Sequence, residues 1–306
     1  MSALSEQLKH HILLIDGAMG SLMQARLPQY KGLADELVLR MPAEIAQVHR
    51  AYLEAGADCI TTCTFNSHGN HHLCLAAAKL ARKIADEYTA KTGIPRFVLG
   101  DVGPTNDMLS LSPNMNQPAL RAIQFDELKE AYRVQIAALI EGGADAILIE
   151  TATDTLNVKA AIQAYQNACA TLVPTQGNAI PLLISFTISD RSGRLLNGQT
   201  IEAFVESVLH AQPLAIGINC GYGAQGILPW LRQLHRAVAG RCAISCHPNA
   251  GLPNAMGGYD DTPEDIVRMM RPMIEEGIVN IIGGCCGTTP AHIRALRQLL
   301  VRITAG

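Results

Sequence analysis

Three cysteines stand in positions that suit a metal site. Cys285 and Cys286 are adjacent within the glycine-rich stretch 283–290, and Cys220 follows the apolar run 214–219. Thiolates are preferred zinc ligands, and three protein ligands leave a fourth coordination position open, as catalytic zinc sites require. A single free cysteine is more often a small buried residue. The glycines beside the adjacent pair favour zinc, because two neighbouring ligands on one ion need a close approach of the backbone.

Two carboxylates could act on the substrate of such a site. Asp16 and Glu150 each stand at the end of an apolar run of strand length. They are compatible with an acid/base pair and equally with a pair that holds a substrate ammonium group. A metal-bound thiol has already lost its proton and needs no general base, so the zinc hypothesis favours ammonium binding.

The other six cysteines and a histidine cluster are interpreted as structural. Cys59 and Cys63, like Cys242 and Cys246, have even spacing in predicted strands, so each pair is expected to point to one side, into the core. The remaining two lie in helical patterns, at Cys74 and Cys169. A second group has the i, i+3, i+4 spacing of a helical face and could ligate a metal, although a junction between a loop and a helix is favoured. It consists of His68, His71 and His72.

Several other site types are excluded by their missing partners. The run 221–226 matches the dinucleotide fingerprint G-x-G-x-x-G, but residues 224–258 contain no Asp or Glu to hold a ribose. The sequence has no P-loop and no G-x-S-x-G nucleophile elbow. No Lys stands at a predicted strand end, which argues against a metal-free aldolase-like barrel with a Schiff base.

The elements that must position these residues form a repeated βα pattern. Apolar runs of strand length alternate with amphipathic helical stretches, and glycines mark several of the helix ends. Eight strands are predicted, at about 12–17, 57–63, 96–102, 145–150, 181–187, 214–219, 242–247 and 279–283. Eight such units in one chain predict a single-domain α/β fold over residues 1–306, a (β/α)8 TIM barrel. Its carboxyl strand ends would gather the candidate residues on one face.

Composition narrows the class of protein. The chain has 306 residues, is 17% charged and 4% aromatic, and has a formal net charge of -3 without clusters of basic residues. These values give no electrostatic footprint for a nucleic acid or an anionic membrane. No apolar run approaches the length of a membrane span or a signal-peptide core, and nine cysteines suit reduced thiols. A cytoplasmic protein is expected.

Five motifs, in order along the chain, resemble the homocysteine S-methyltransferase family from about Ile12 to the C-terminus. They are Asp16-Gly-Ala-Met-Gly20, Gly103-Pro-Thr-Asn106, Glu150-Thr151, Gly217-Ile-Asn-Cys220 and Gly283-Gly-Cys-Cys-Gly-Thr-Thr-Pro290. The resemblance implies that Cys220, Cys285 and Cys286 bind Zn2+ with the homocysteine sulfur as the fourth ligand. It also implies that Asp16 and Glu150 hold the amino acid end of homocysteine, and that Asn249 takes the fourth zinc position without substrate.

Within the family, three segments look most like the N-terminal homocysteine-binding domain of cobalamin-dependent methionine synthase. They are Ser110-Leu-Ser-Pro113, Asp154-Thr-Leu-Asn157 and His247-Pro-Asn-Ala-Gly-Leu-Pro-Asn254. The resemblance implies methionine formation from homocysteine and a methylated corrinoid such as methylcobalamin, with methyltetrahydrofolate as the ultimate donor. The full synthase continues into folate, cobalamin and reactivation domains. Because the sequence has no Asp-x-His-x-x-Gly run to ligate cobalt, we expect the corrinoid on another domain or protein.

Two alternatives stay open on the sequence alone. The same fold could take its methyl group from S-methylmethionine or a betaine, which a comparison of donors would decide. It could also be a non-catalytic zinc barrel that delivers a thiol, which methyl transfer from any donor would exclude. The acceptor half of the reaction is argued from residues, whereas the donor depends on the resemblance.

Overall fold

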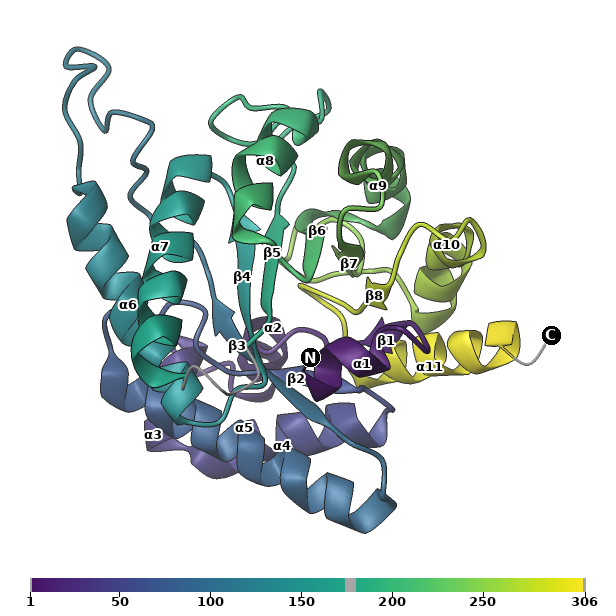
Figure 1. The fold of residues 1–306 in the computed structure, drawn as a ribbon. Coiled ribbons are helices and arrows are strands. Elements are labelled where there is room, and N and C mark those ends of the chain that lie inside the picture. Colours follow the sequence, from purple (N-terminus) through teal and green to yellow (C-terminus); the bar gives the residue numbers. More distant parts are fainter. Residues whose placement is uncertain (1, 174–179, 305–306) are drawn as a thin grey trace.

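Eight parallel strands curve into one barrel, which confirms the expected fold (Figure 1). The computed structural model describes residues 2–173 and 180–304. Neighbouring strands pair in the order β1-β8-β7-β6-β5-β4-β3-β2, and a single bridge between Ile15 and Cys59 joins β1 to β2. The strands are β1 (Leu13–Leu14), β2 (Cys59–Thr61), β3 (Phe97–Val102), β4 (Ala146–Ala152), β5 (Leu182–Phe186), β6 (Ala215–Gly223), β7 (Ala243–Asn249) and β8 (Ile281–Ile282).

Helices surround the strands in Figure 1, and a helix follows each strand along the chain. Prolines begin three of them, Pro42, Pro263 and Pro290, where the missing N–H has no helical partner to lose. The major helices are α4 (Pro42–Glu54), α5 (His71–Thr92), α6 (Phe125–Glu141), α7 (Thr155–Leu172), α8 (Ile201–Val208), α9 (Ala224–Val238), α10 (Pro263–Glu275) and α11 (Pro290–Thr304). Shorter ones are α1 (Ala3–Gln7), α2 (Gly20–Arg26), η1 (Ala34–Glu36), α3 (Leu37–Arg40) and η2 (Leu209–Ala211).

The buried apolar side chains form two layers. One cluster fills the barrel with residues from alternate strand positions, such as Leu99, Leu148 and Leu183. Leu4 of α1 joins this cluster, so α1 covers one end of the barrel. The larger cluster lies between the strands and the outer helices. This division explains the near-continuous apolar runs, because a parallel strand is buried on both faces. None of the described helices is long and apolar enough to cross a membrane.

The structure corrects some of the expected boundaries. Strands β1 and β8 have two residues each, whereas β6 and β7 extend beyond the predicted ends, to Gly223 and Asn249. Cys59 packs in the barrel interior, but Cys63 lies in the outer cluster. The expectation that both point to one side was wrong, because β2 ends at Thr61 and strand alternation does not continue to residue 63.

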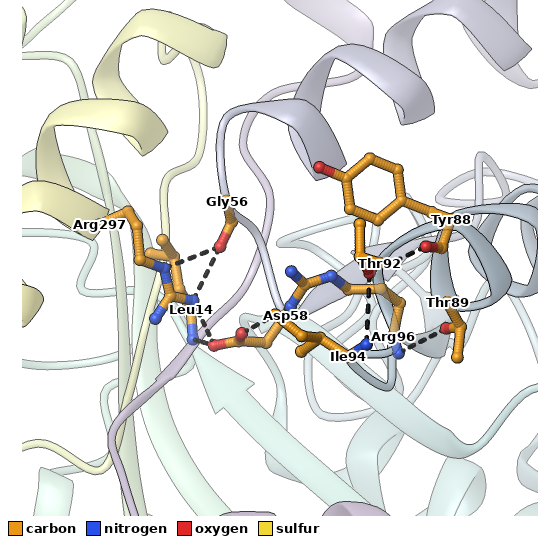
Figure 2. Close-up of polar contacts among 9 residues, drawn as sticks. All are labelled: Leu14, Gly56, Asp58, Tyr88, Thr89, Thr92, Ile94, Arg96 and Arg297. Atoms are coloured by element: carbon orange, nitrogen blue, oxygen red, sulfur yellow. Dashed lines mark hydrogen bonds and ion pairs between the residues drawn. The ribbon is translucent and has the colours of Figure 1, made fainter.

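A buried carboxylate reinforces the weakly paired seam between β1 and β2. Asp58, just before β2, accepts a hydrogen bond from the backbone N–H of Leu14 at 2.9 Å (Figure 2). It also pairs with Arg96 beside β3 at 3.0 Å and with Arg297 of α11 at 2.5 Å. The second arginine donates to the carbonyl of Gly56 as well. These contacts tie both sides of the seam to the last helix of the chain.

Candidate metal and substrate site

The three predicted cysteines meet at the carboxyl ends of β6 and β8. The Sγ atom of Cys286 lies 3.9 Å from that of Cys220 and 4.0 Å from that of Cys285. All three sulfur atoms lie within 4.8 Å of one another, and they are the one group of at least three Cys, His, Asp or Glu among residues 2–173 and 180–304 with this property. Tetrahedral zinc with bonds of about 2.3 Å separates its sulfur ligands by about 3.8 Å. The sulfur positions therefore fit a zinc ion.

Local backbone geometry brings the adjacent pair to this point. The N–H of Cys285 donates to the Pro248 carbonyl at 2.8 Å, and the N–H of Ala250 donates to the Cys286 carbonyl at 2.9 Å. A Cβ on Gly284 would lie 2.3 Å from the Oγ1 of Thr288, and one on Gly287 would lie 2.3 Å from the Tyr259 side chain. Glycine is thus required on both sides of the pair, as the sequence suggested.

The thiols are electrostatically coupled. Hydrogen bonds from Cys220 and Cys285 lower the pKa of Cys286 to about 3, and the Tyr259 hydroxyl adds a further hydrogen bond that lowers it. These hydrogen bonds favour the thiolate form of Cys286, the form in which sulfur ligates a metal. Tyr259, on the loop before α10, was not foreseen, because no motif marks a loop tyrosine that packs against Gly287.

Asp16 and Glu150 lie in the same cavity as the cysteines. Asp16 is 2% exposed and accepts hydrogen bonds from Thr61, through the backbone N–H at 2.9 Å and the hydroxyl at 3.1 Å. Burial raises the pKa of Asp16 well above its usual range, and the Thr61 bonds oppose that rise. Burial, followed by the negative charge of Cys220, raises the pKa of Glu150 to about 7. Asp16 is buried, Glu150 is half-buried, and neither forms an ion pair with another described residue, so together they form a suitable site for a positively charged group.

Asn219 organises the space between Glu150 and the sulfur atoms. Its Oδ1 accepts from the Thr151 N–H at 2.9 Å and from the Ser185 hydroxyl at 2.7 Å. Its Nδ2 donates to the Thr151 hydroxyl at 2.7 Å and to Glu150 at 3.3 Å. The sequence offered only its place beside Cys220, so its role as a fully buried linker was missed.

The backbone is strained at two residues that adjoin Asn219, its hydrogen-bond partner Thr151 and the next residue in the chain, Cys220. Thr151 has φ 56° and Cys220 has φ 58°, values that residues other than glycine rarely adopt. Such strain persists only where surrounding bonds enforce it, and it gathers at functional sites. Here the Asn219 amide holds Thr151 from two directions. Gly221, with φ 69°, continues the left-handed turn after Cys220, whereas Gly223 ends β6 in an extended conformation and Gly226 lies in α9.

Two polar residues of β7 are buried beside the adjacent cysteines. Asn249 is 3% exposed and its Oδ1 has no hydrogen-bond partner, while the next residue, Ala250, bonds to the Cys286 carbonyl. This orphaned oxygen belongs to the residue before that contact, and its role as the fourth zinc ligand stays a prediction. His247 is also buried, its Nε2 has no partner, and burial lowers its pKa to about 4.

The histidine cluster does not converge. The ring of His68 contacts the Gln135 side chain at 2.8 Å and the Pro104 carbonyl at 3.1 Å. His71 is exposed and pairs with Glu141 of α6, and His72 is exposed. These side chains occupy the junction at the start of α5, in agreement with the favoured interpretation.

A cavity of about 500 Å³ joins the candidate residues at the carboxyl ends of the strands. Asp16, Glu150 and the three cysteines line it, and the segment 17–37 with residues 61–66 forms its outer wall. This end of a (β/α)8 barrel carries the active site. The volume lies in the range that holds drug-sized ligands.

The model of the family described as "Homocysteine S-methyltransferase" matches residues 13–300. The chain belongs to this family. The protein is accordingly a methyltransferase, and homocysteine is the methyl acceptor that defines its family.

Several solved structures are similar in fold to this methyltransferase. The homocysteine methyltransferase MmuM from Escherichia coli in its metallated form has a TM-score of 0.77 and 24% identity, over 96% of this chain and 98% of that one. Its apo form has a TM-score of 0.71 and 25% identity, over 95% and 97%. A rubisco-like protein from Burkholderia fungorum shares only the barrel, with a TM-score of 0.56, 13% identity, and coverage of 99% of this chain and 64% of that one.

Proposed function

We propose that this methyltransferase binds zinc through Cys220, Cys285 and Cys286 and methylates the sulfur of homocysteine to give methionine. The observation that carries the proposal is the convergence of three sulfur atoms, the buried carboxyl of Asp16 and the half-buried carboxyl of Glu150 in one cavity. Zinc bound there would bind the homocysteine sulfur and keep it as a nucleophilic thiolate at neutral pH. The existence of a metallated form of the E. coli relative supports a metal in this fold.

The protein's own residues bind and orient the substrate. Asp16 and Glu150 receive the ammonium group, and the Asn219 amide holds Glu150 at a fixed distance from the sulfur cluster. In the transfer, the homocysteine sulfur forms a bond to the methyl carbon while the bond from that carbon to its donor breaks. The bonding pair leaves with the donor. The Asn249 oxygen would occupy the fourth ligand position before substrate arrives.

Metal content tests the acceptor half of the proposal. Replacing Cys220, Cys285 or Cys286 with Ser one at a time should release most of about one bound zinc per chain, because each removes one of three protein ligands. Elemental analysis of the purified variants measures this. Cys242→Ser is a matched control, since that half-buried thiol stands at the opposite end of β7. Full zinc in all three single variants would refute the assignment.

For the donor, we propose a methylated corrinoid carried by another domain or protein, as the segments 110–113 and 247–254 suggest. The cavity favours a second candidate, because its volume of about 500 Å³ leaves room beside homocysteine for a small donor such as S-methylmethionine. Methylcobalamin and S-methylmethionine should be assayed at equal concentration with zinc-loaded enzyme. We expect faster methionine formation from methylcobalamin. The opposite order would replace the donor and leave the zinc proposal intact.

A further inference from the structure

A third carboxylic acid, Asp101 on β3, lies in the cavity beside Glu150 and has no role in the chemistry described so far. Asp101 is 5% exposed and lines the cavity with Asp16 and Glu150. In the register of β3 and β4, Asp101 pairs with Leu148, two residues before Glu150, so the two carboxyl groups line the same cavity from neighbouring strands, and a hydrogen bond between them contributes to the pKa of each. Two carboxyl groups can share a hydrogen bond only when one of them carries a proton.

Among the described residues, the side chains near Asp101 that could donate a hydrogen bond to its carboxyl group donate to other acceptors. The Thr64 hydroxyl donates to the backbone carbonyl of Asp101 at 2.7 Å, and the Thr62 hydroxyl is 2.7 Å from that of Thr64. The Gln135 amide donates to the carbonyls of Thr64 and Asp101, at 2.8 and 3.1 Å. The carboxyl Oδ1 of Asp101 is consequently buried without a partner. An ionised carboxylate in this position would be left largely unsolvated.

The charges near Asp101 also favour its neutral, protonated form. They come from Glu150 on β4, Asp35 on η1 and Asp16 on β1, and all three are acidic. Burial and the charge of Glu150 raise the pKa of Asp101 well above its usual range. Glu150, by contrast, has the Asn219 amide as a donor at 3.3 Å, and the hydrogen bond from Asp101 lowers its pKa. The shared proton therefore belongs on Asp101.

We propose that Asp101 is a positioning residue whose protonated carboxyl donates a hydrogen bond to Glu150 and so keeps Glu150 ionised and oriented toward the homocysteine ammonium. This inference rests on the proposed ammonium-binding role of Glu150. It also limits the charge of the site, because the substrate ammonium then meets two carboxylates instead of three. A carboxylic acid held neutral so that it can donate is chemically equivalent to an amide in this position.

That equivalence gives the test. Asp101→Asn keeps a donor of the same shape, whereas Asp101→Ala removes it. In zinc-loaded enzyme we expect Asn to leave the homocysteine KM within about threefold of wild type and Ala to raise it about tenfold or more, the range for a hydrogen bond to a charged group. The kcat should change little in both variants. The acid limb of kcat/KM should move to higher pH in the Ala variant alone, because Glu150 loses the bond that lowers its pKa.

Controls separate positioning from folding. Thr89→Val removes the hydrogen bond that the Thr89 hydroxyl accepts from the Arg96 N–H just before β3, and Thr89 does not line the cavity, so this variant should lower Tm and leave the homocysteine KM unchanged. Zinc content should be unaltered in every variant. If the Ala variant does not fold, Asp101→Val, which fills the space without a donor, replaces it. The near-isosteric Asn variant remains decisive by itself.

The outcomes distinguish a failure of the Asp101 inference from a failure of the proposed ammonium-binding role of Glu150. An Asn variant as impaired as Ala, or an Ala variant with an unchanged KM, would overturn the role of Asp101. Glu150→Gln serves as the reference. If Glu150→Gln leaves homocysteine binding intact, the ammonium site itself is misassigned. If Glu150→Gln impairs binding and Asp101→Ala does not, only the inference about Asp101 fails.

Discussion

At the scale of single residues, the sequence identified the site residues whose type and spacing are unusual. It did not identify those whose role depends on burial. An adjacent cysteine pair among glycines has few structural uses, so Cys285 and Cys286 could be selected by type and spacing. Asn219 and Asp101 are ordinary polar residues whose importance comes from full burial and from the partners that the barrel register brings to them. Tyr259 is similar, because it reaches the cluster from a loop.

The carboxylates yield a prediction about substrate affinity. Glu150→Gln and Asp16→Asn should each weaken homocysteine binding by about 1.5 to 3 kcal/mol, the range for hydrogen bonds to charged groups, with zinc content unchanged. Calorimetric titration of zinc-loaded protein with homocysteine measures the loss. A fall in kcat at unaltered affinity would instead assign these residues to proton transfer.

The raised pKa of Glu150 adds a pH dependence. Burial raises this pKa to about 7, so the carboxylate predominates above that pH and the neutral acid below it. A neutral acid attracts an ammonium group weakly, so homocysteine affinity should fall as pH drops through about 7. Titrations at pH 8 and pH 6 would show this change in wild type. Loss of the thiol proton on zinc also weakens binding at lower pH, in wild type and variant alike. Glu150→Gln should therefore reduce the change to that common part, and an equal change in the variant would assign the titration to another group.

At the scale of elements, periodicity located all eight strands and the helices between them, but not their ends. Strands β1 and β8 shrink to two residues, whereas β6 extends four residues and β7 two residues beyond the predicted ends. Hydrophobicity reports burial, whereas a strand ends where its neighbour no longer offers hydrogen bonds. The extended ends of β6 and β7 carry the site, where Cys220 and Asn249 depart from an apolar pattern.

The seam between β1 and β2 gives a prediction at this scale. Asp58→Ala would leave Arg96 and the Leu14 N–H buried without their acceptor (Figure 2). Removing one partner of a buried ion pair destabilises a protein by about 3–5 kcal/mol. Chemical denaturation should show a loss of this size. The exposed pair of Glu130 with Arg133 is the matched control, and Glu130→Ala should have a far smaller effect. Equal losses would show that the seam does not depend on Asp58.

At the scale of the whole molecule, the barrel separates chemistry from stability. The cysteines and the three acids stand at the carboxyl ends of the strands, and the Asp58 cluster precedes the start of β2. The sequence predicted the first half of this division, because a (β/α)8 barrel gathers the carboxyl ends of its strands on one face, but it gave no sign of the Asp58 cluster. It could not predict the cavity, whose volume depends on how the segment 17–37 folds over the strand ends.

Buried histidines make the stability of the whole fold sensitive to acid. His49 on α4 is fully buried, neither ring nitrogen has a partner, and burial lowers its pKa from 6.5 to about 4. Between pH 6.5 and about 4 the unfolded chain binds a proton at His49 that the folded chain does not bind. The free energy of unfolding therefore falls as pH drops through this range. The loss from this residue is about 1.3 kcal/mol between pH 7.5 and pH 5.5.

Comparison with a variant isolates that contribution. Buried acids whose pKa is raised, such as Asp16, stabilise the fold increasingly as pH falls. The change in the free energy of unfolding of wild type therefore contains contributions of both signs. His247 titrates in the same direction as His49 and is present in both proteins. Urea denaturation of wild type and His49→Leu at the two pH values should show a pH-dependent loss that is smaller in the variant by about 1.3 kcal/mol. An identical loss in both proteins would mean that His49 accepts its proton without leaving the core.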